Sequence, residues 1–573
     1  AYMINEGGIS PSNILVVTFS RAAAKEMKER FLSFTGQQYT PVTFGTFHGV
    51  FYGILKQAYG FTAANILSDE EKFGILRELT LNYGGDLAEE GDFPEEIARE
   101  ISVVKGNKIA LEHYYSSCCP DEVFRQIYQG YREACQSRRK LDFDDMILYC
   151  YELFVQRKDI LEAWQKKFQY ILVDEFQDIN QLQYDIVRML AKPQNNLFIV
   201  GDDDQSIYHF RGARPEIMLN FTRDYPDAET VTLDVNYRCS GQILSAAMHV
   251  IGENKKRFSK KLSTPNQVGK AVQIREFQNP REEYLAVVSE LRERMENGER
   301  LEDTAILLRT NQEAEGLVGA LMERQVPFNM KEKLPNLFQH WICRNLLAYM
   351  HFAAGEKNRK YFLEFMNRPN RYISRDALSL SSVVSFEELK EFYKDKDWMC
   401  DRITTLETHL RVLKSLAPYA AINFIRKGMG YEEYLREYAE YRKIKPEELS
   451  EILDRLTEST KGMNSLEEWE SYIEEYTEKL EEQARKAEQE REGVLISTLH
   501  GVKGLEYEQV YILNVNEGSM PYRKAVLEPA IEEERRLFYV GMTRARKQLA
   551  LCYVRQQYEK KREPSRFLKE AGV

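Results

Sequence analysis

The feature that most constrains this chain is an apolar strand pattern that ends in acidic residues. Ile171-Leu172-Val173 runs directly into Asp174-Glu175-Phe176-Gln177-Asp178. In an open α/β sheet, ligands bind at the carboxyl ends of parallel strands, and carboxylates there commonly hold Mg²⁺ or activate water. The pattern therefore predicts a parallel sheet with a phosphate-handling site at this strand end. Taken alone, the acidic pair could equally be the solvated end of an ordinary strand.

A site of this kind normally faces a phosphate-binding loop of the form G-x-x-x-x-G-K-[ST]. No such loop occurs between Ala1 and Val573. The backbone amides and the lysine that would hold the β- and γ-phosphates are therefore absent from these residues. We expect little or no ATP hydrolysis by the 573-residue chain.

Length and composition indicate a multidomain protein without a membrane span. At 573 residues the chain exceeds one hydrophobic core, using about 150 residues per domain as a guide. No apolar run approaches the roughly 20 residues that cross a bilayer, and there is no secretory signal pattern, so we expect a cytoplasmic location. The eight cysteines include no C-x-x-C pair, which predicts reduced thiols rather than a metal centre. The net charge of −11 does not exclude nucleic acid, because a local basic groove can dominate binding.

Strand and helix patterns divide the chain into two α/β regions, each interrupted by helices. Apolar runs predict strands at 13–19, 170–173 and 197–200 in the first region, and at 271–277, 303–309, 493–498, 509–515 and 548–553 in the second. We expect a first domain of residues 1–60 and 140–222 with a helical insertion at 61–139, and a second domain of residues 223–336 and 491–573 with a helical insertion at 337–490.

Three further positions could act on a phosphate group. Gln205 follows the next strand of the first sheet and could sense a γ-phosphate or orient water; the alternative is a polar turn. Arg238 and Arg544 could stabilise charge on a transferring phosphoryl group from across a domain cleft. Either arginine alone would more often be an ordinary surface residue.

Other residues could contact nucleic acid. Lys503 lies in a glycine-punctuated loop that could reach a DNA phosphate, and Glu506 could accept a hydrogen bond from a ribose hydroxyl. The alternative is a plain connection with a C-cap glycine. Aromatic rings could stack on the bases of a single strand, although core packing is the commoner fate of phenylalanine. These rings are Phe19, Phe47, His48, Tyr208 and Phe210.

Nine segments, in this order, resemble the UvrD/PcrA/Rep branch of superfamily 1 DNA helicases. The segments are spread along nearly the whole chain, and the resemblance extends over the same length. They are TFSRAAAKEMKERF from Thr18, GTFHGVF from Gly45, LDFDDMI from Leu141, VDEFQD from Val173, VGDDDQSIYHFRGA from Val200, NYRCSGQI from Asn236, AILLRTNQEAEGL from Ala305, STLHGVKGLEYEQVYI from Ser497 and EEERRLFYVGMTRARKQL from Glu532.

The resemblance implies two RecA-like motor domains of the P-loop NTPase type, with ATP between them and single-stranded DNA running across both. It implies that Asp174 holds Mg²⁺, that Glu175 activates water, and that Gln205 reports the γ-phosphate. Arg238 and Arg544 would be arginine fingers, Tyr237 would stack on adenine and Glu506 would meet the ribose. The positions that match DNA contacts of the family are Phe19, Thr46, Phe47, His48, Tyr208, Phe210, His500 and Lys503.

The chain departs from the family pattern in one important respect. Ser20-Arg21, Cys239 and Tyr507 are mild changes, whereas the P-loop and the earlier adenine-reading glutamine motif are both missing. By analogy, the P-loop would end about ten residues before Ala1. A central strand of the first sheet would be missing with it, so we expect uncovered hydrogen-bonding edges and apolar side chains.

Two functions fit these observations. The first is an ATP-dependent 3′→5′ DNA helicase of repair or replication, acting on single strands and single-strand/double-strand junctions, monomeric in isolation and able to meet other repair or replication proteins. The second is a non-catalytic scaffold that binds DNA or a protein partner through the same architecture. A helicase–nuclease fusion has no support, because the chain ends soon after its last motif at Val573.

Overall fold

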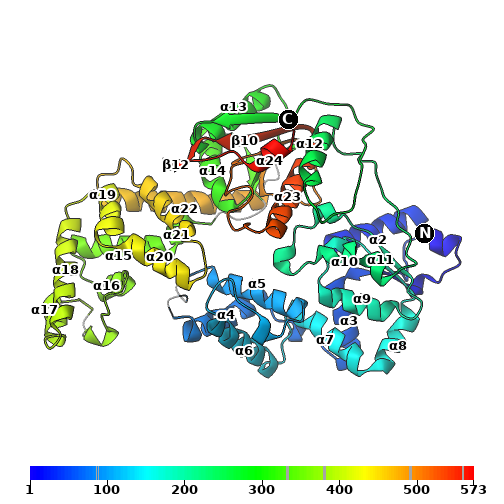
Figure 1. Ribbon diagram of the computed structural model, residues 1–573, viewed down its shortest axis with the longest axis horizontal. Coiled ribbons are helices and arrows are strands. Elements are labelled where there is room, and N and C mark those ends of the chain that lie inside the picture. The colour runs from blue at the N-terminus through cyan, green and yellow to red at the C-terminus, as the bar shows by residue number, and fades with distance from the viewer. Residues whose placement is uncertain are drawn as a thin grey trace.

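The computed structural model describes residues 1–573 except 86, 88–89, 331–334, 379–381, 490–492, 558–559 and 573, and it leaves the side chains of 483–489 undescribed. The chain forms two parallel sheets flanked by helices, with two groups of helices inserted into them (Figure 1). The predicted α/β class with two parallel sheets is therefore confirmed. The predicted boundary between 490 and 491 falls outside the described residues.

The first sheet has four parallel strands in the order β2-β1-β3-β4. Its strands are β1 (Ile14–Thr18), β2 (Thr43–Thr46), β3 (Tyr170–Val173) and β4 (Leu197–Ile199). Strand β3 has the predicted bounds, while β2 was not predicted. The helices of this unit are α1 (Tyr2–Asn5), α2 (Arg21–Thr35), α3 (Phe47–Tyr59), α7 (Phe143–Gln156), α8 (Lys158–Lys167), α9 (Gln181–Ala191), α10 (Pro215–Leu219) and α11 (Phe221–Asp224).

Strand β4 forms an uncovered edge of the first sheet. Phe198 on this strand is 62% exposed and Val200, just beyond it, is 43% exposed. Val231 and Leu233 lie in an extended stretch outside the named strands and are 82% and 83% exposed. Proteins usually cover or charge such edges, because an open apolar edge invites pairing with another chain. Strand β4 is thus an edge with exposed apolar side chains, and its cover by a further strand stays a prediction.

The second sheet has six parallel strands in the order β5-β10-β9-β6-β8-β7. They are β5 (Gln273–Phe277), β6 (Thr304–Leu308), β7 (Phe328–Met330), β8 (Val494–Thr498), β9 (Tyr507–Ile512) and β10 (Ala545–Val554). Five of the six were predicted, and β7 was missed. The helices of this unit are α12 (Gly241–Gly252), α13 (Pro280–Glu296), α14 (Ala314–Glu323), α23 (Glu528–Met542) and α24 (Arg566–Glu570). A short ribbon of β11 (Gln556–Gln557) and β12 (Lys560–Lys561) follows β10.

Both insertions are helical, as predicted. The first contains α4 (Asp69–Tyr83), α5 (Phe93–Gly106) and α6 (Asp121–Ser137). The second contains α15 (Trp341–Ala354), α16 (Arg359–Phe365), α17 (Phe386–Phe392), α18 (Asp397–Leu413), α19 (Pro418–Asn423), α20 (Tyr431–Tyr441), α21 (Pro446–Ser459) and α22 (Leu466–Gln489). Although the two groups are far apart in sequence, they lie side by side at the left and bottom of Figure 1 and share one hydrophobic core.

A buried arginine joins the two insertions. The Arg442 guanidinium donates to the Glu90 carboxylate, with Nε 2.9 Å from each oxygen, and to Glu96 at 2.9 Å. It also donates to the Cys118 carbonyl. Its side chain is only 3% exposed. Because breaking a buried ion pair strands a charge away from water, this contact ties the two helical groups together.

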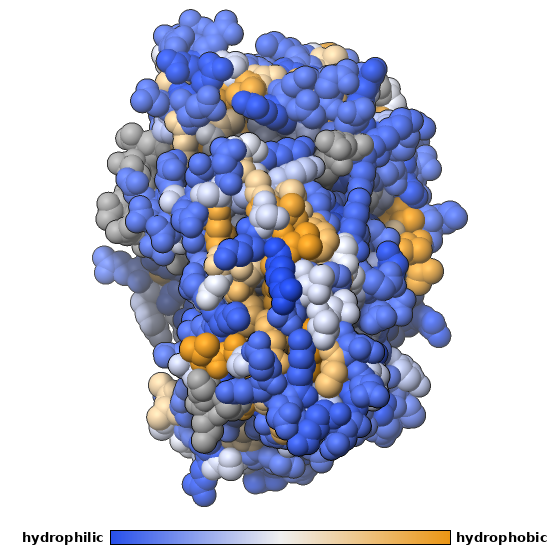
Figure 2. Space-filling model, turned by 90° about the vertical axis from the view of Figure 1, so that its left-hand side faces the viewer, coloured by the Kyte–Doolittle hydropathy of each residue, from blue (hydrophilic) through white to orange (hydrophobic). Residues whose placement is uncertain are grey.

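The outer surface of the second insertion is mostly hydrophilic. Figure 2 shows this end of the molecule, where hydrophobic residues gather in a band between charged ones. Among the residues that the structure describes, no helix is long and apolar enough to cross a membrane. All eight cysteines are free thiols, and seven are buried.

Candidate functional site

The acidic strand end lies between the two sheets. Asp174 directly follows β3, and its carboxylate accepts a hydrogen bond from the Thr18 hydroxyl at 3.4 Å. Burial, followed by the neighbouring charge of Glu175, raises the pKa of Asp174. Glu175 has a left-handed backbone with φ of 53°, a strained conformation for a residue with a side chain and one that concentrates at functional sites. Its carboxylate accepts a hydrogen bond from the Gln177 amide at 2.5 Å.

Gln205 ends a short turn that follows β4. Its side-chain amide donates to Asp202 Oδ2 at 2.8 Å, and its backbone carbonyl accepts a hydrogen bond from Lys503 Nζ at 3.0 Å. Because Lys503 follows strand β8, this bond joins the carboxyl ends of the two sheets. The predicted γ-phosphate sensor therefore lies at the boundary between the two α/β units.

Lys503 is buried at this boundary. Its amine contacts the Asp178 carboxylate and lies 3.4 Å from Glu175 Oε2. The lysine side chain is 10% exposed, whereas Asp178 is 2% exposed. Burial raises the pKa of Asp178 to about 6, although the charge of Lys503 opposes this. The geometry places Lys503 beside the expected water-activating carboxylate; its contact with a DNA phosphate stays a prediction.

Arg238 and Glu506 form an ion pair in the second unit. Arg238 Nε lies 2.8 Å from Glu506 Oε2, and the hydrogen bond from Arg238 is the main cause of a lowered pKa of Glu506. Tyr237, immediately before this arginine, is 75% exposed. The structure therefore places Tyr237, Glu506 and Arg238, the residues expected to meet adenine, ribose and phosphate, close together. Arg238 and Glu506 are paired with each other.

Arg544 is buried without a carboxylate partner among the described residues. Its Nε donates to the Val540 carbonyl at 2.9 Å and its Nη1 to the Leu505 carbonyl at 3.2 Å. Burial, and then the charge of Arg238, lowers its pKa to about 10, while the charge of Glu175 opposes this shift. Buried cations are normally paired. A buried guanidinium whose hydrogen bonds within the described chain go only to neutral oxygens is suited to receive an anion.

Two acidic groups could hold a divalent cation, and they differ in fit. Asp174 has no salt bridge to a basic side chain in the described part of the chain, and burial disfavours its negative charge. A bound cation would relieve that penalty, so Asp174 with the Thr18 hydroxyl fits Mg²⁺. The carboxylates of Asp202, Asp203 and Asp204 also lie within 4.8 Å of one another. Each of these three already forms an ion pair with Arg257 or Lys260.

One aromatic cluster joins the two units. The Phe210 ring lies 6.0 Å from the Tyr208 ring and 5.3 Å from the His500 ring. Arg211 lies over both Tyr208 and Phe210. Phe210 is 41% exposed. Burial lowers the pKa of His500 to about 3, so this imidazole is neutral at pH 7. An exposed ring between a tyrosine and a neutral histidine is suited to stack on a base.

A second aromatic group lies over α3. Phe19 is 38% exposed and packs edge-on against Phe47 at 5.6 Å, but Phe47 itself is 1% exposed and belongs to the core. Thr46 caps the helix by accepting from the Gly49 amide at 3.1 Å. His48 lies 5.6 Å from Phe143, and burial lowers the pKa of His48. The contacts of these residues with DNA remain predictions, and Phe47 fits the core-packing alternative better.

Sequence reasoning missed several residues that shape this site. Asp178 was seen only as part of a motif, and Phe143 only as part of another. Arg257 and Lys260, which form ion pairs with Asp204 and Asp202, were not predicted. The local signal is a basic run, KKRFSKK at residues 255–261, and it does not identify a partner about 55 residues earlier.

Comparison with known proteins agrees with this geometry. Residues 1–226 match the family model described as UvrD/REP helicase N-terminal domain, and residues 231–556 match UvrD-like helicase C-terminal domain. The chain is 33% identical to YjcD of Bacillus subtilis (strain 168), over 99% of this chain and 76% of that protein. It is 31% identical to DNA helicase II of Escherichia coli (strain K12), over 100% of this chain and 82% of that protein. It is 30% identical to ATP-dependent DNA helicase Rep of Salmonella typhimurium (strain LT2), over 100% of this chain and 88% of that protein.

Two parallel sheets whose carboxyl ends meet through the contacts of Lys503 with Glu175, Asp178 and Gln205 define an α/β protein of two units. The two matching models together span most of the chain. The chain belongs to the UvrD/REP helicase family, whose named relatives are ATP-dependent DNA helicases.

Proposed function

We propose that this chain provides the motor of an ATP-dependent 3′→5′ helicase that moves on single-stranded DNA. The observation that carries the proposal is that the second unit reaches the acidic end of β3. Lys503 Nζ lies 3.4 Å from Glu175 Oε2 and donates to the Gln205 carbonyl at 3.0 Å, and Arg238 and Arg544 belong to the same unit as Lys503. Arginines that face a carboxylate across a cleft can stabilise charge on a transferring phosphoryl group while the carboxylate activates water. Residues 1–60 and 140–222 would form the first motor domain, and residues 223–336 and 491–573 the second.

The residues of the cleft then take distinct roles. Asp174 would hold Mg²⁺, which supplies charge neutralisation on the phosphates. Glu175 accepts the proton of the attacking water, and Gln205 orients that water or senses the γ-phosphate. Tyr237 offers an exposed ring for adenine. Glu506 would exchange its bond with Arg238 for a ribose hydroxyl, which frees the arginine for phosphate.

DNA would cross the aromatic residues on the same side of the cleft. Phe210 and Tyr208 come from the first unit, and His500 comes from the second. Since this cluster spans both units, a change in their separation alters the space offered to a base. Stacking on such rings contributes about 1–3 kcal/mol per base without demanding a sequence. This suits a motor of repair or replication that acts at single-strand/double-strand junctions.

A non-catalytic scaffold is the second candidate, and one observation favours it. Within the described chain the phosphate-side residues pair with one another: Arg238 with Glu506, and Lys503 with Asp178 and Glu175. With no P-loop among these 573 residues, such pairs would persist and leave DNA binding without turnover.

The test is single-strand-DNA-stimulated ATP hydrolysis by two forms of the protein. One is the 573-residue chain, and the other carries a P-loop segment ahead of Ala1. We expect turnover only in the longer form and its loss in the Glu175→Gln variant of that form, with DNA binding kept in all three. No ATP hydrolysis by the longer form, with single-strand binding intact, would favour the scaffold. Robust turnover by the 573-residue chain would refute the proposed ATP site.

A further inference from the structure

A basic segment, residues 254–260, links helix α23 to the turn that carries Gln205. Its first half is bound to the helix. The Asn254 amide donates to the Glu532 carbonyl at 3.0 Å, and the Lys255 backbone amide donates to Glu532 Oε1 at 2.7 Å. Arg536 donates to the Lys256 carbonyl at 2.9 Å. Since α23 ends at Met542, two residues before Arg544, the segment is fixed to the element that presents this arginine.

The second half of the segment binds the acidic turn of the first unit, residues 202–204. Arg257 makes a two-pronged contact with Asp204, with Nε at 2.8 Å and Nη2 at 2.7 Å. Lys260 Nζ lies 2.5 Å from Asp202 Oδ1 and 3.1 Å from Asp204 Oδ2, and it also contacts Asp203. The Phe258 amide donates to Asp203 Oδ2 at 2.8 Å. Every carboxylate of the turn therefore has a partner in the second unit.

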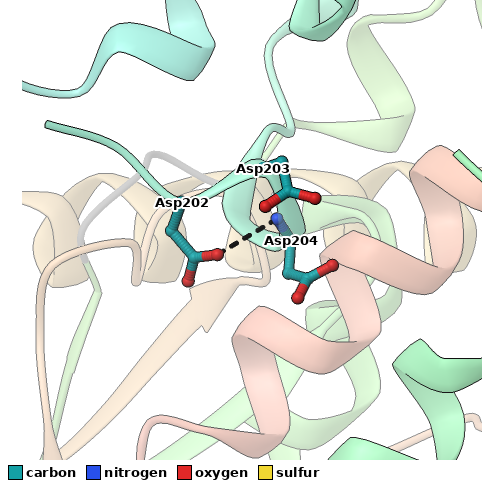
Figure 3. Close-up of side chains that lie close together, drawn as sticks. All are labelled: Asp202, Asp203 and Asp204. Carbon is teal, nitrogen blue, oxygen red and sulfur yellow. Dashed lines mark hydrogen bonds between the residues drawn. The ribbon is translucent and has the colours of Figure 1, made fainter. Parts of the chain in front are cut away.

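Figure 3 shows the three aspartates of this turn. The Asp204 amide donates to Asp202 Oδ1 at 3.2 Å, and the other oxygen of Asp202 accepts the Gln205 side chain at 2.8 Å. Asp203 and Asp204 are 0% and 1% exposed. Three such close carboxylates would repel one another without compensation. The lysine amine stands where a metal ion would otherwise be expected, so the cluster is an ion-pair network and not a metal site.

We propose that Arg257 and Lys260 form a clasp that positions Gln205 relative to Arg544. The chain of contacts runs from Gln205 through Asp202 to Lys260, and from the basic segment through Glu532 and Arg536 to α23. It joins the γ-phosphate sensor of one unit to the arginine-finger helix of the other. Both basic residues are positioning residues because they act through the turn. The inference rests on the proposed function and adds the means by which the two units hold the sensor.

The experiment compares Lys260→Met with Lys260→Arg and with Lys261→Met, an exposed lysine at the next position. Each is made in the P-loop-extended chain, and kcat and KM for ATP are measured with saturating single-stranded DNA. Because displacing a reacting group by 1 Å can reduce rate about a hundredfold, we expect Lys260→Met to lower kcat at least about tenfold with KM within about twofold. Lys260→Arg should keep most of the rate, and Lys261→Met all of it.

Hydrogen exchange at the Asp204 and Gln205 amides is measured in the same variants of the 573-residue chain. Faster exchange in Lys260→Met alone would support the clasp without requiring turnover. A lowered melting temperature with unchanged kcat would overturn the proposal, since the network would then be merely structural. Unchanged exchange in Lys260→Met would also overturn it. If the extended wild-type chain does not hydrolyse ATP, the proposed function fails, and the exchange measurement decides the clasp separately.

Discussion

Replacing Lys503 by methionine removes the only basic side chain that forms a salt bridge with Asp178 among the described residues. The substitution keeps most of the apolar stem of the lysine and deletes its charge. Asp178 is 2% exposed and Lys503 10% exposed, so the pair is buried, and losing one member of a buried pair costs about 3–5 kcal/mol. The contact between Lys503 and Glu175 contributes about 0–1 kcal/mol more, because the Glu175 side chain is 43% exposed.

This loss should be visible in thermal unfolding. In a unit of about 250 residues each kcal/mol shifts the melting temperature by about 2–4 °C, so a loss of about 3–6 kcal/mol should make Lys503→Met melt about 6–24 °C below the wild type at pH 8. The matched control is Lys547→Met, which removes a 74% exposed lysine paired with Glu508. That surface pair is worth about 0–1 kcal/mol. Equal melting temperatures for the two variants would refute the reasoning.

The loss of stability in Lys503→Met should depend on pH in a defined direction. Burial raises the pKa of Asp178 to about 6 in the folded chain, so the folded carboxyl binds a proton more readily than the unfolded one. Its contribution to stability therefore falls as pH rises from about 4 to about 6. Without Lys503 the pKa rises further. The deficit of Lys503→Met should accordingly be smaller at pH 5 than at pH 8, and a pH-independent deficit would contradict this account.

Three further predictions test other parts of the molecule. Glu175→Gln in the P-loop-extended chain should reduce kcat about 10²–10⁴-fold in a steady-state assay, with the Kd for single-stranded DNA unchanged. Phe210→Ala should weaken single-strand binding by about 1–3 kcal/mol in fluorescence titration, whereas Phe392→Ala, which removes a ring that is 54% exposed on the second insertion, should not. Arg442→Met should speed hydrogen exchange where the insertions meet, because it strands buried carboxylates; Arg436→Met, at a 53% exposed surface pair, is the control and should leave exchange as it was.

The strands could be predicted wherever a buried apolar run has clear ends. Strand β3 was predicted with its observed bounds, and the strands beside it to within one or two residues. Strands β2 and β7 were missed because neither is an apolar run: Thr43–Thr46 contains a glycine and two threonines, and Phe328–Met330 has an asparagine at its centre. The helical insertions were predicted, but their common core was not. Local periodicity shows which face of a helix is apolar and does not show which distant helix covers it.

The candidate site was predicted less completely. Because the strands are parallel, the acidic residues after β3 and the turn after β4 had to lie at one edge of the sheet. Ion pairing across the units could not be predicted in the same way. Lys503 was assigned to DNA phosphate from its loop, yet its amine lies against Asp178 and Glu175. Arg257 and Lys260 had no motif to mark them, since their role depends on a turn contributed by the other unit.

The shared core of the insertions also has a mechanical consequence. Besides their direct ion pairs, the two α/β units are connected by the chain between α11 and α12 and through the two packed insertions. Because the insertions share a core, a change in the angle between the sheets acts on that core as well. A change in the angle between the sheets must be matched by rotation where the insertions join them. A distance reporter across the two insertions should therefore respond when the angle between the sheets changes.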